Sequence, residues 1–600
     1  MNQMLDLWNR KDRRPDETIS IFSSVLEELG IRTAFLDKKN HMDLWHSCRL
    51  ILEDLPSLGT NGKGISDEFS MASALGEFFE RLQSGTLLNE YFPGKNDDTS
   101  KSFASLEEAA AQTKEYLGAV FRGESVDDIK KMLEKNEKYR SFQEYYSAFE
   151  DKTVLLPDKL IYFLCGTNGI SAGNTKEEAF VQGLSEIFER YVMKYIYVTA
   201  TTASDFPVLS HTCYEHTRSS TLLQKIEEGG YHYFVKDCTI GGHYPVLGLL
   251  IFDKTYTRYC FNLSCDLDFD LCLQRCITEV FQGHDFDITF RMQMQDVFPN
   301  ESGNWWDPQI DPRIGLVRSL YDGTGRLPGF MLEQSIQTVE LPRVFMKKKA
   351  SNSECASILS DILRKKELKL YIRDCSCLGV PTLRIYVPGI TEIFDYGGAI
   401  AIINSLGIVR SLMKQEQVVS SEYRSLFHHL KKILDYPSYS YNLTIAKLSG
   451  ILFEDSLIHS SLHDVNFFFA SLCFFLKEYE LANRYFKSHY DAYKAVRKKT
   501  ISTYVDCILS GFQNGISIDR IKTLFLHVRE YDEVCEFIDK LQRIKECGPQ
   551  RIHCNSCQNC LIRTGCYFDS WHAIYTRIRQ RQRDFDDLPH DLAFLRCINP

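Results

Sequence analysis

The chain has 600 residues, of which 44% are hydrophobic and 25% are charged, and its formal net charge is −10 at pH 7. This length predicts two or three domains, and the balance of hydrophobic and charged residues excludes a disordered or low-complexity chain. The acidic balance argues against direct binding of nucleic acid, because proteins that do so usually carry an excess of lysine and arginine.

The hydrophobic runs and the first residues indicate where the protein works. The densest hydrophobic runs, residues 467–476 and 244–252, are shorter than the ~20 residues that a membrane-spanning helix needs. The opening sequence MNQMLDLWNRKDRRPDE has no hydrophobic core of a secretory signal. We therefore expect a cytoplasmic protein that does not bind a membrane.

The first 400 residues alternate between patterns typical of helices and patterns typical of strands. Helical periodicity covers residues 16–29, 176–192 and 271–282, and strand-like runs cover residues 244–252 and 383–387. This alternation predicts an α/β or α+β domain over residues 1–400. Residues 93–160 are polar and rich in lysine and glutamate, and we expect them to form a helical insertion in that domain.

Beyond residue 400 the strand patterns end, and we expect an all-helical domain over residues 401–545. Ala482 and Phe486 stand at the A-x3-F spacing of tetratricopeptide helices, which predicts a tetratricopeptide-like arrangement. A plain helical bundle is the alternative. Residues 546–600 are then a separate cysteine-rich tail.

Two segments of the first domain resemble each other. Residues 60–82 read TNGKGISDEFSMASALGEFFERL, and residues 167–192 read TNGISAGNTKEEAFVQGLSEIFERYV. Both open on Thr-Asn-Gly, which predicts a turn in which Gly62 and Gly169 take positive φ. Both then continue as a helix that ends in Glu-x-Phe-Glu-Arg.

Three helices carry acidic and amide side chains on one face. At about 100° per residue, each of the following sets falls within a narrow arc: Glu178, Gln182, Glu186 and Glu189; Glu77, Glu80 and Arg81; Arg275, Glu279 and Gln282. One interpretation is that each arc is a solvated surface. The other is a magnesium–nucleotide site, since gathered carboxylates need a cation, Mg²⁺ is often shared between carboxylates and phosphates, and arginine suits phosphate. No GxxxxGK[ST] motif is present, so such a site would lack a P-loop.

These motifs resemble those of the YcaO family. The resemblance rests on the two segments above, on the Arg275, Glu279 and Gln282 helix, and on the sequences GGHYPV at 241–246 and LRIYVPG at 383–389. It extends over nearly the whole chain. It implies a YcaO-type domain over residues 1–400 that uses ATP and Mg²⁺ to activate a peptide-backbone amide. In that reaction the amide oxygen attacks the γ-phosphate, and phosphate leaves when a nucleophile adds.

The resemblance also implies roles for individual residues. The implied Mg²⁺ ligands are Glu77, Glu80, Glu178, Glu186 and Glu189. The implied ATP-binding residues are Lys11, Thr18, Ser171, Asn174, Arg190 and Arg275, with Gln182, Glu279 and Gln282 in support. No catalytic residue is assigned, because phosphoryl transfer asks the protein mainly for positioning and charge neutralisation.

The likeness is greatest to stand-alone bacterial members of the family. It implies an accessory role in β-methylthiolation of an aspartate in a small-subunit ribosomal protein, with a radical methylthiotransferase as partner and a homodimer as assembly. The alternative is an azoline-forming cyclodehydratase or a thioamide synthetase of a ribosomally made peptide pathway, acting with separate partner proteins. Azoline-forming members end in a proline-rich tail, which the ending RCINP does not resemble. A third, non-enzymatic interpretation is that bound ATP only supports a helical interaction scaffold.

The cysteine-rich tail has a pattern that this resemblance does not explain. Cys554, Cys557, Cys560 and Cys566 form the sequence C-x2-C-x2-C-x5-C. Thiolates this close repel one another unless they are protonated or bound to metal, and four of them suit tetrahedral zinc or an iron–sulfur cluster. Zinc, an iron–sulfur cluster and reduced free thiols stay open as alternatives.

Overall fold

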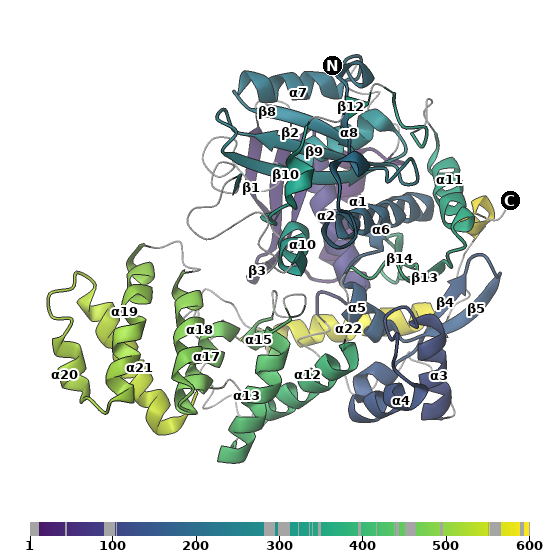
Figure 1. The fold of residues 1–600 in the computed structure, drawn as a ribbon. Helices are drawn as coiled ribbons and strands as arrows, with labels where there is room; N and C mark the ends of the chain where they lie inside the picture. The colour runs from purple at the N-terminus through teal and green to yellow at the C-terminus, as the bar shows by residue number, and fades with distance from the viewer. Residues whose placement is uncertain are drawn as a thin grey trace. The chain divides into compact units, whose positions relative to one another are not determined.

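A computed structural model describes much of the chain and divides it into two compact units. The described residues are 11–41, 45–88, 103, 105–280, 294–297, 312–321, 323–334, 337–338, 340–345, 350–393, 398–415, 417–436, 439, 443–449, 464–491, 496–549, 551, 566–587 and 593–598. The first unit comprises residues 1–89, 94–399 and 572–600, and the second comprises residues 90–93 and 400–571. Figure 1 shows the helices and strands of both units.

The first unit begins with a helix and a small antiparallel sheet. Helix α1 (Pro15–Glu28) precedes strands β1 (Thr33–His41), β2 (Trp45–Leu52) and β3 (Leu55–Gly64), which pair in the order β1-β2-β3, and helix α2 (Asp67–Gln83) follows. The Ser66 side chain caps the amino end of α2. Helix α2 buries Leu75, Phe78 and Phe79, and it packs on β2, β3 and α1. This packing fixes α2 against β3.

A six-stranded sheet forms the second layer of this unit. Its order is β11 (Gln295–Asp296), β10 (Arg258–Cys265), β9 (Val246–Phe252), β8 (His232–Asp237), β7 (Val208–Leu209) and β12 (Gln337–Thr338). All seven residues of β9 are buried, as expected for a central strand. Helices α7 (Ser219–Glu228) and α8 (Phe269–Val280) contribute to the core beside this sheet.

A five-stranded sheet completes the unit. Its order is β5 (Lys152–Leu156), β4 (Gln143–Ser147), β13 (Tyr371–Asp374), β14 (Thr382–Tyr386) and β6 (Ile170–Ala172), with antiparallel pairing throughout. Helix α6 (Lys176–Val198) contacts β14 and β6 of this sheet and β10 of the other, and α11 (Asn352–Lys365) packs beside it. Helix α6 is therefore buried between the two larger sheets.

The predicted fold class is confirmed, with one local exception. Helices α3 (Leu106–Tyr116), α4 (Val126–Lys135) and α5 (Asp158–Cys165) occupy the segment expected to be helical, but β4 and β5 form a hairpin there. In β4 the buried Gln143, Tyr145 and Ser147 alternate with two half-buried residues. That period of two is the signature of a strand, and polar composition alone concealed it.

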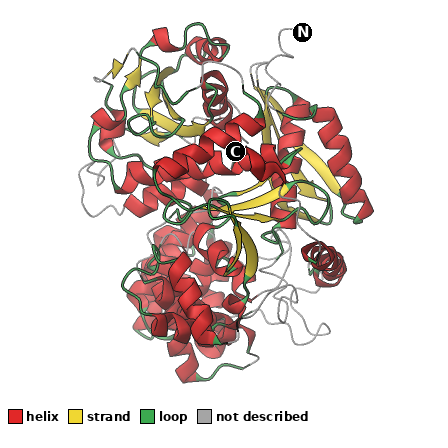
Figure 2. Cartoon of the chain, turned by 90° about the vertical axis from the view of Figure 1, so that its right-hand side faces the viewer, coloured by secondary structure: helices red, strands yellow, loops and turns green. Residues whose placement is uncertain are grey.

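The described part of the second unit is built from helices (Figure 2). They are α12 (Ala399–Lys414), α13 (Ser420–Leu434), α15 (Ile445–Ser449), α17 (Val465–Phe475), α18 (Tyr479–Asp491), α19 (Val496–Gln513), α20 (Ile518–Thr523) and α21 (Tyr531–Cys547). Ala482 and Phe486 are buried on α18, where the Phe486 ring packs on Phe467 and Phe537. The tetratricopeptide likeness stays a prediction. Across all described helices, none is both long enough and apolar enough to cross a membrane.

The chain returns to the first unit at its end, through residues 572–600. Helix α22 (Phe568–Asp586) is followed by the short helix η9 (Ala593–Cys597). The Arg577 guanidinium donates to the Leu29 carbonyl at 2.8 Å, at the carboxyl end of α1, and the Phe594 ring packs on Phe180 of α6. The remaining short elements are η2 (Glu137–Arg140), η3 (Ala203–Asp205), η4 (His211–Cys213), α10 (Pro312–Tyr321) and η5 (Gly329–Leu332).

Candidate functional site

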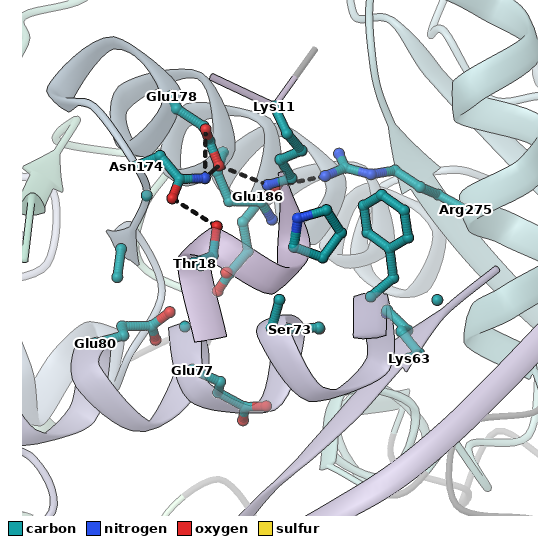
Figure 3. A pocket seen from close by; sticks show the side chains of 18 of the residues that line it. Lys11, Thr18, Lys63, Ser73, Glu77, Glu80, Asn174, Glu178, Glu186 and Arg275 are labelled. Atoms are coloured by element: carbon teal, nitrogen blue, oxygen red, sulfur yellow. Dashed lines mark hydrogen bonds and ion pairs between the residues drawn. The ribbon is translucent and has the colours of Figure 1, made fainter. Parts of the chain in front are cut away.

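Most of the predicted site residues surround a cavity of about 440 Å³ in the first unit. Helices α1, α2, α6 and α8 and strand β3 each contribute to its wall (Figure 3). Of the predicted residues, the cavity is lined by Lys11, Thr18, Glu77, Glu80, Asn174, Glu178, Gln182, Glu186, Arg190, Arg275 and Glu279. The three helix faces that the sequence singled out therefore converge on one space and are not solvated surfaces.

Three predicted residues do not line the cavity. Ser171 is fully buried on β6, where its hydroxyl donates to the Ala179 carbonyl at 2.6 Å. Glu189 is half-buried and does not line the cavity, although Glu186 and Arg190 on either side of it in α6 do, and Gln282 lies outside the described residues. The structure thus brings neither Ser171 nor Glu189 to the cavity surface.

The two Thr-Asn-Gly segments differ in the structure. Gly169 has φ of +82°, as predicted for a turn. The prediction for Gly62 is wrong, because this residue lies inside strand β3. A Cβ atom on Gly62 would collide with the Ser70 carbonyl oxygen and with Ala74 of α2. Glycine is needed there for the close approach of helix to strand, and not for a turn.

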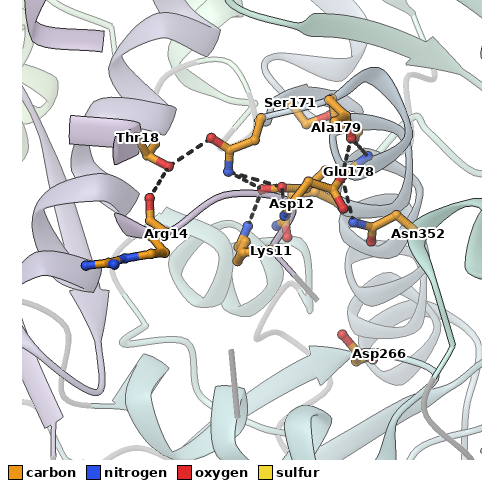
Figure 4. A network of polar contacts seen from close by, with 12 residues as sticks. Lys11, Asp12, Arg14, Thr18, Ser171, Glu178, Ala179, Asp266 and Asn352 are labelled. Atoms are coloured by element: carbon orange, nitrogen blue, oxygen red, sulfur yellow. Dashed lines mark hydrogen bonds and ion pairs between the residues drawn. The ribbon is translucent and has the colours of Figure 1, made fainter. Parts of the chain in front are cut away.

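Glu178 lies at the amino end of α6 in a closed set of polar contacts (Figure 4). Its carboxylate accepts from Lys11 Nζ at 2.9 Å, from the Asp12 backbone amide at 3.0 Å and from Asn174 Nδ2 at 3.1 Å. Burial alone would raise the pKa of Glu178, but Lys11 and these donors lower it below its usual value. The segment before α1 is thereby attached to the start of α6.

The other carboxylates are less well neutralised. Burial, together with Glu186 and Glu77, raises the pKa of Glu80 well above its usual value. Burial also raises the pKa of Glu186 against the effect of Arg190, whose Nη2 lies 2.9 Å from Glu186 Oε1. Burial raises the pKa of Glu189 to about 7. These carboxyl groups need further positive charge to ionise together.

Arginine side chains line the same cavity as most of these carboxylates. Arg275 Nη2 donates to Gln182 Oε1 at 2.5 Å, and its Nη1 lies 3.6 Å from Asp266 Oδ2. Arg81 forms an ion pair with Glu77 one turn away on α2. A guanidinium held in this way presents a planar set of donors that suits the oxygens of a phosphate.

The sequence reasoning missed several residues of the cavity wall. Asn61 and Lys63 both line the cavity from β3, and Asn352 lines it from the start of α11. The positions of Asn61 and Lys63, two apart in a strand, put them on one face. The sequence TNGKG contains this alternation, but interpreting the segment as a turn left it unrecognised.

The donor set fits magnesium in its chemistry. Hard divalent cations prefer carboxylate and carbonyl oxygens, and the cavity wall offers the carboxylates of Glu77, Glu80 and Glu186. As the side chains stand, no three His, Cys, Asp or Glu residues within the described ranges are grouped closely enough to hold a metal ion. Basic side chains, among them Arg81 and Arg190, pair with the carboxylates instead.

The predicted cysteine site falls largely outside the part of the chain that the structure describes. Cys554, Cys557 and Cys560 are outside it, and Cys566 is half-buried at its edge. A zinc or iron–sulfur site in the tail therefore stays a prediction.

Comparison with known sequences matches the chain to one family. The sequence model of the family described as "YcaO cyclodehydratase, ATP- and Mg²⁺-binding" matches residues 61–391. An uncharacterized protein of Haemophilus influenzae is 28% identical over 413 residues, which are 66% of this chain and 68% of that one. The ribosomal protein S12 methylthiotransferase accessory factor YcaO of Escherichia coli is 26% identical over 421 residues, again 66% of this chain and 68% of that one.

Solved structures are more distant. YcaO from Methanopyrus kandleri bound with AMPPCP and Mg²⁺ is similar with a TM-score of 0.43 and 16% identity, over 64% of this chain and 93% of that one. A heterocyclase in complex with substrate and cofactor has a TM-score of 0.43 and 17% identity, over 63% of this chain and 52% of that one.

Proposed function

The chain belongs to the YcaO family, and from this we propose that it binds ATP with Mg²⁺ in the cavity between α1, α2, α6 and α8 and uses ATP to activate a peptide-backbone amide. The observation that carries the proposal is the convergence of acidic and basic side chains from three separate helices on one cavity. A wall with both acidic and basic side chains suits a ligand that contains both phosphates and metal ions.

The acidic and the basic residues of the cavity would bind different parts of the metal–nucleotide complex. The carboxylates of Glu77, Glu80 and Glu186 would hold Mg²⁺, which supplies neutralisation of the triphosphate when bound. Arg190 and Arg275 would contact phosphate oxygens, because a guanidinium already fixed by Glu186 or Gln182 needs little reorganisation. Glu178, Lys11 and Asn174 would hold the segment before α1 against α6.

The chemical step would be a transfer of the γ-phosphate to the oxygen of a backbone amide. The bond between the β–γ bridging oxygen and the γ-phosphorus breaks, ADP leaves, and the amide carbon becomes susceptible to a nucleophile. When that nucleophile adds, the phosphate departs with the former amide oxygen. The protein's part is to align the two oxygens and to stabilise the charge on the transferred group.

The favoured setting is the accessory role in methylthiolation of a ribosomal protein, supported by the 26% identity with the Escherichia coli accessory factor. The second candidate, peptide cyclodehydration, is supported by the description of the family model. Mass spectrometry separates the two. Incubation with a methylthiotransferase and a ribosomal protein would add a methylthio group to that protein, whereas cyclodehydration of a precursor peptide would remove water.

The nucleotide site is tested first by calorimetry with Mg²⁺ and the non-hydrolysable analogue AMPPNP. We expect the wild type to bind, Glu186→Gln to lose most of the affinity, and Glu177→Gln, on the same helix but outside the cavity lining, to behave as the wild type. Phosphate release from ATP should follow the same order. Absence of binding by the wild type would overturn the proposal.

A further inference from the structure

Lys63 is a half-buried cation on the wall of the candidate site. It lies between Gly62 and Gly64 in β3, and both glycines face α2 so closely that a Cβ atom would collide with that helix. Successive residues of a strand point to opposite faces, so Lys63 points away from α2. Lys63 lines the cavity (Figure 3). Its ammonium group forms an ion pair with Glu279 of α8, which also lines the cavity.

The surroundings of Lys63 are acidic. Its side chain is only 26% exposed, and the carboxylates of Glu189, Glu77 and Glu186 are close enough to act on it electrostatically. Burial lowers the pKa of Lys63 to about 8, although Glu189 opposes that shift. We call Glu77, Glu186, Glu189 and Glu279 the carboxylate cluster. Lys63 thus supplies this cluster with a positive charge.

The charges of the cavity wall are balanced as a whole. The described lining contains six basic side chains, Lys11, Arg13, Lys63, Arg81, Arg190 and Arg275, and six acidic ones, Glu77, Glu80, Glu178, Glu186, Asp266 and Glu279. A bare divalent cation would add its full charge to this balanced wall. A metal–triphosphate complex also brings phosphate oxygens, so the basic side chains can bind the phosphates while the acidic ones bind the metal. A wall that mixes both charges therefore suits the complex better than the free cation.

We propose that the Lys63 ammonium is the resident counter-cation of the carboxylate cluster. It neutralises these carboxylates in place of a divalent metal until a nucleotide binds. The triphosphate then offers Lys63 a second anionic partner, and the carboxylates are released to the metal. Metal and nucleotide therefore enter as a coupled pair. This inference rests on the proposed function, because it concerns the same cavity.

The test measures binding of Mn²⁺ by electron paramagnetic resonance, with and without AMPPNP. Wild-type protein should bind Mn²⁺ weakly alone and tightly with AMPPNP. Lys63→Met should raise the affinity for Mn²⁺ alone by about tenfold or more, because the competing charge is gone. Lys63→Arg keeps the charge and should resemble the wild type, as should Lys152→Met at the exposed start of β5.

The thermodynamic linkage between metal binding and nucleotide binding gives a second measurement. The factor by which Mn²⁺ strengthens AMPPNP binding must equal the factor by which AMPPNP strengthens Mn²⁺ binding. In Lys63→Met this factor should shrink by about tenfold, measured by calorimetry from either side. A role of Lys63 in folding alone would change thermal unfolding without changing the coupling.

The outcomes separate the inference from the proposed function. If the wild type binds Mn²⁺ with AMPPNP, and Lys63→Met leaves the affinity for Mn²⁺ alone unchanged, the counter-cation role is overturned and the nucleotide site stands. Tight binding of Mn²⁺ to the wild type without nucleotide overturns the role as well. If the wild type binds neither, the proposed function itself fails. Should Lys63→Met not fold, Lys63→Gln makes the same comparison with a polar side chain.

Discussion

The hydroxyl of Thr18 on α1 lies 2.8 Å from Asn174 Oδ1, ahead of α6, although the two residues are 156 positions apart in the sequence. The same Asn174 donates through its Nδ2 to Glu178, so its amide is held at both ends. Thr18 also lies 3.0 Å from the Arg14 carbonyl. One buried contact thus sets the orientation of an amide and a carboxylate in the candidate site (Figure 4).

Replacement of Thr18 by valine should weaken nucleotide binding. The change keeps the shape but leaves Asn174 Oδ1 without its donor, at a cost of about 1–3 kcal/mol, which corresponds to a loss of about fivefold to 150-fold in AMPPNP affinity. Thr18→Ser restores the hydroxyl and should restore binding. Ser24→Ala, on the same helix with its hydroxyl bonded to the Ile21 carbonyl, is the matched control. Equal affinities in calorimetry would refute this role of Thr18.

Removal of the Asp158 charge should destabilise the first unit. Asp158 Oδ1 accepts from Arg384 Nη1 at 2.7 Å and from the Tyr145 hydroxyl at 2.6 Å, and it lies 3.2 Å from Arg373 Nη1. Burial opposes ionisation, yet the two arginines hold the pKa of Asp158 well below its usual value. Asp158→Asn leaves two buried guanidinium groups poorly paired, and we expect a loss of about 3–5 kcal/mol in the free energy of unfolding.

Urea unfolding of Asp158→Asn measures this loss. Asp361→Asn breaks an ion pair with Arg364 in which both side chains are partly exposed, and it should cost no more than about 1 kcal/mol. Because the pKa of Asp158 is lowered on folding, its stabilisation is present above the pKa of the unfolded chain and is lost only in strong acid. Similar losses for the two variants would contradict the prediction.

The stability of the protein without metal should depend on pH through Glu189. Burial raises its pKa from 4.5 to about 7, so the folded state holds the Glu189 proton more tightly than the unfolded state does. Glu189 therefore stabilises the folded state in mild acid. Its contribution to the free energy of unfolding declines by up to about 3 kcal/mol as the pH rises from 4.5 to about 7.

Glu189→Gln should flatten this part of the pH profile, measured by urea unfolding from about pH 5 to about pH 8. Glu177→Gln, on the same helix, should keep the wild-type slope. Saturation with Mg²⁺ and AMPPNP should also reduce the slope in the wild type, because bound cations favour the ionised carboxylate. A profile that Glu189→Gln leaves unchanged would show that other groups cause the slope.

Gly62→Ala should disrupt the contact of α2 with β3. The new methyl group would collide with the Ser70 carbonyl oxygen and with Ala74, both of which are fixed by the helix. We expect a loss of about 1–3 kcal/mol in unfolding free energy, accompanied by weaker AMPPNP binding. Gly76→Ala, on α2 itself, meets no atom within 4 Å and gains up to about 1 kcal/mol of helix propensity. Thermal unfolding of the two variants should therefore shift in opposite directions.

The sequence predicted the site most successfully where one helix could be considered alone. The arc that holds Glu178, Gln182 and Glu186 follows from the period of α6 and is observed on the cavity wall. The Gly62 turn was wrong because the tripeptide Thr-Asn-Gly suits both a turn and a strand that meets a helix at close range. Strand pairing decides between them, and β3 pairs with β2 over Gly59–Gly64.

Contacts between segments that are far apart in the sequence could not be predicted, for another reason. Nothing local marks Asp158 as the partner of Arg384, which is 226 positions away. Nor does Lys63, set in a glycine-rich strand, indicate that Glu279 is its neighbour. Such pairs are determined by how sheets and helices stack, and charge pairs of this kind leave no periodic signal in one chain.

The return of residues 572–600 to the first unit bears on how the protein is made. Arg577 contributes a hydrogen bond to the end of α1, the helix that carries Thr18. On the ribosome, the helices within residues 400–571 emerge complete before this contact exists, so the later segment of the chain can finish folding before the earlier one. The candidate cavity, whose wall includes Thr18 of α1, would then be completed after residues 572–598 have been synthesised.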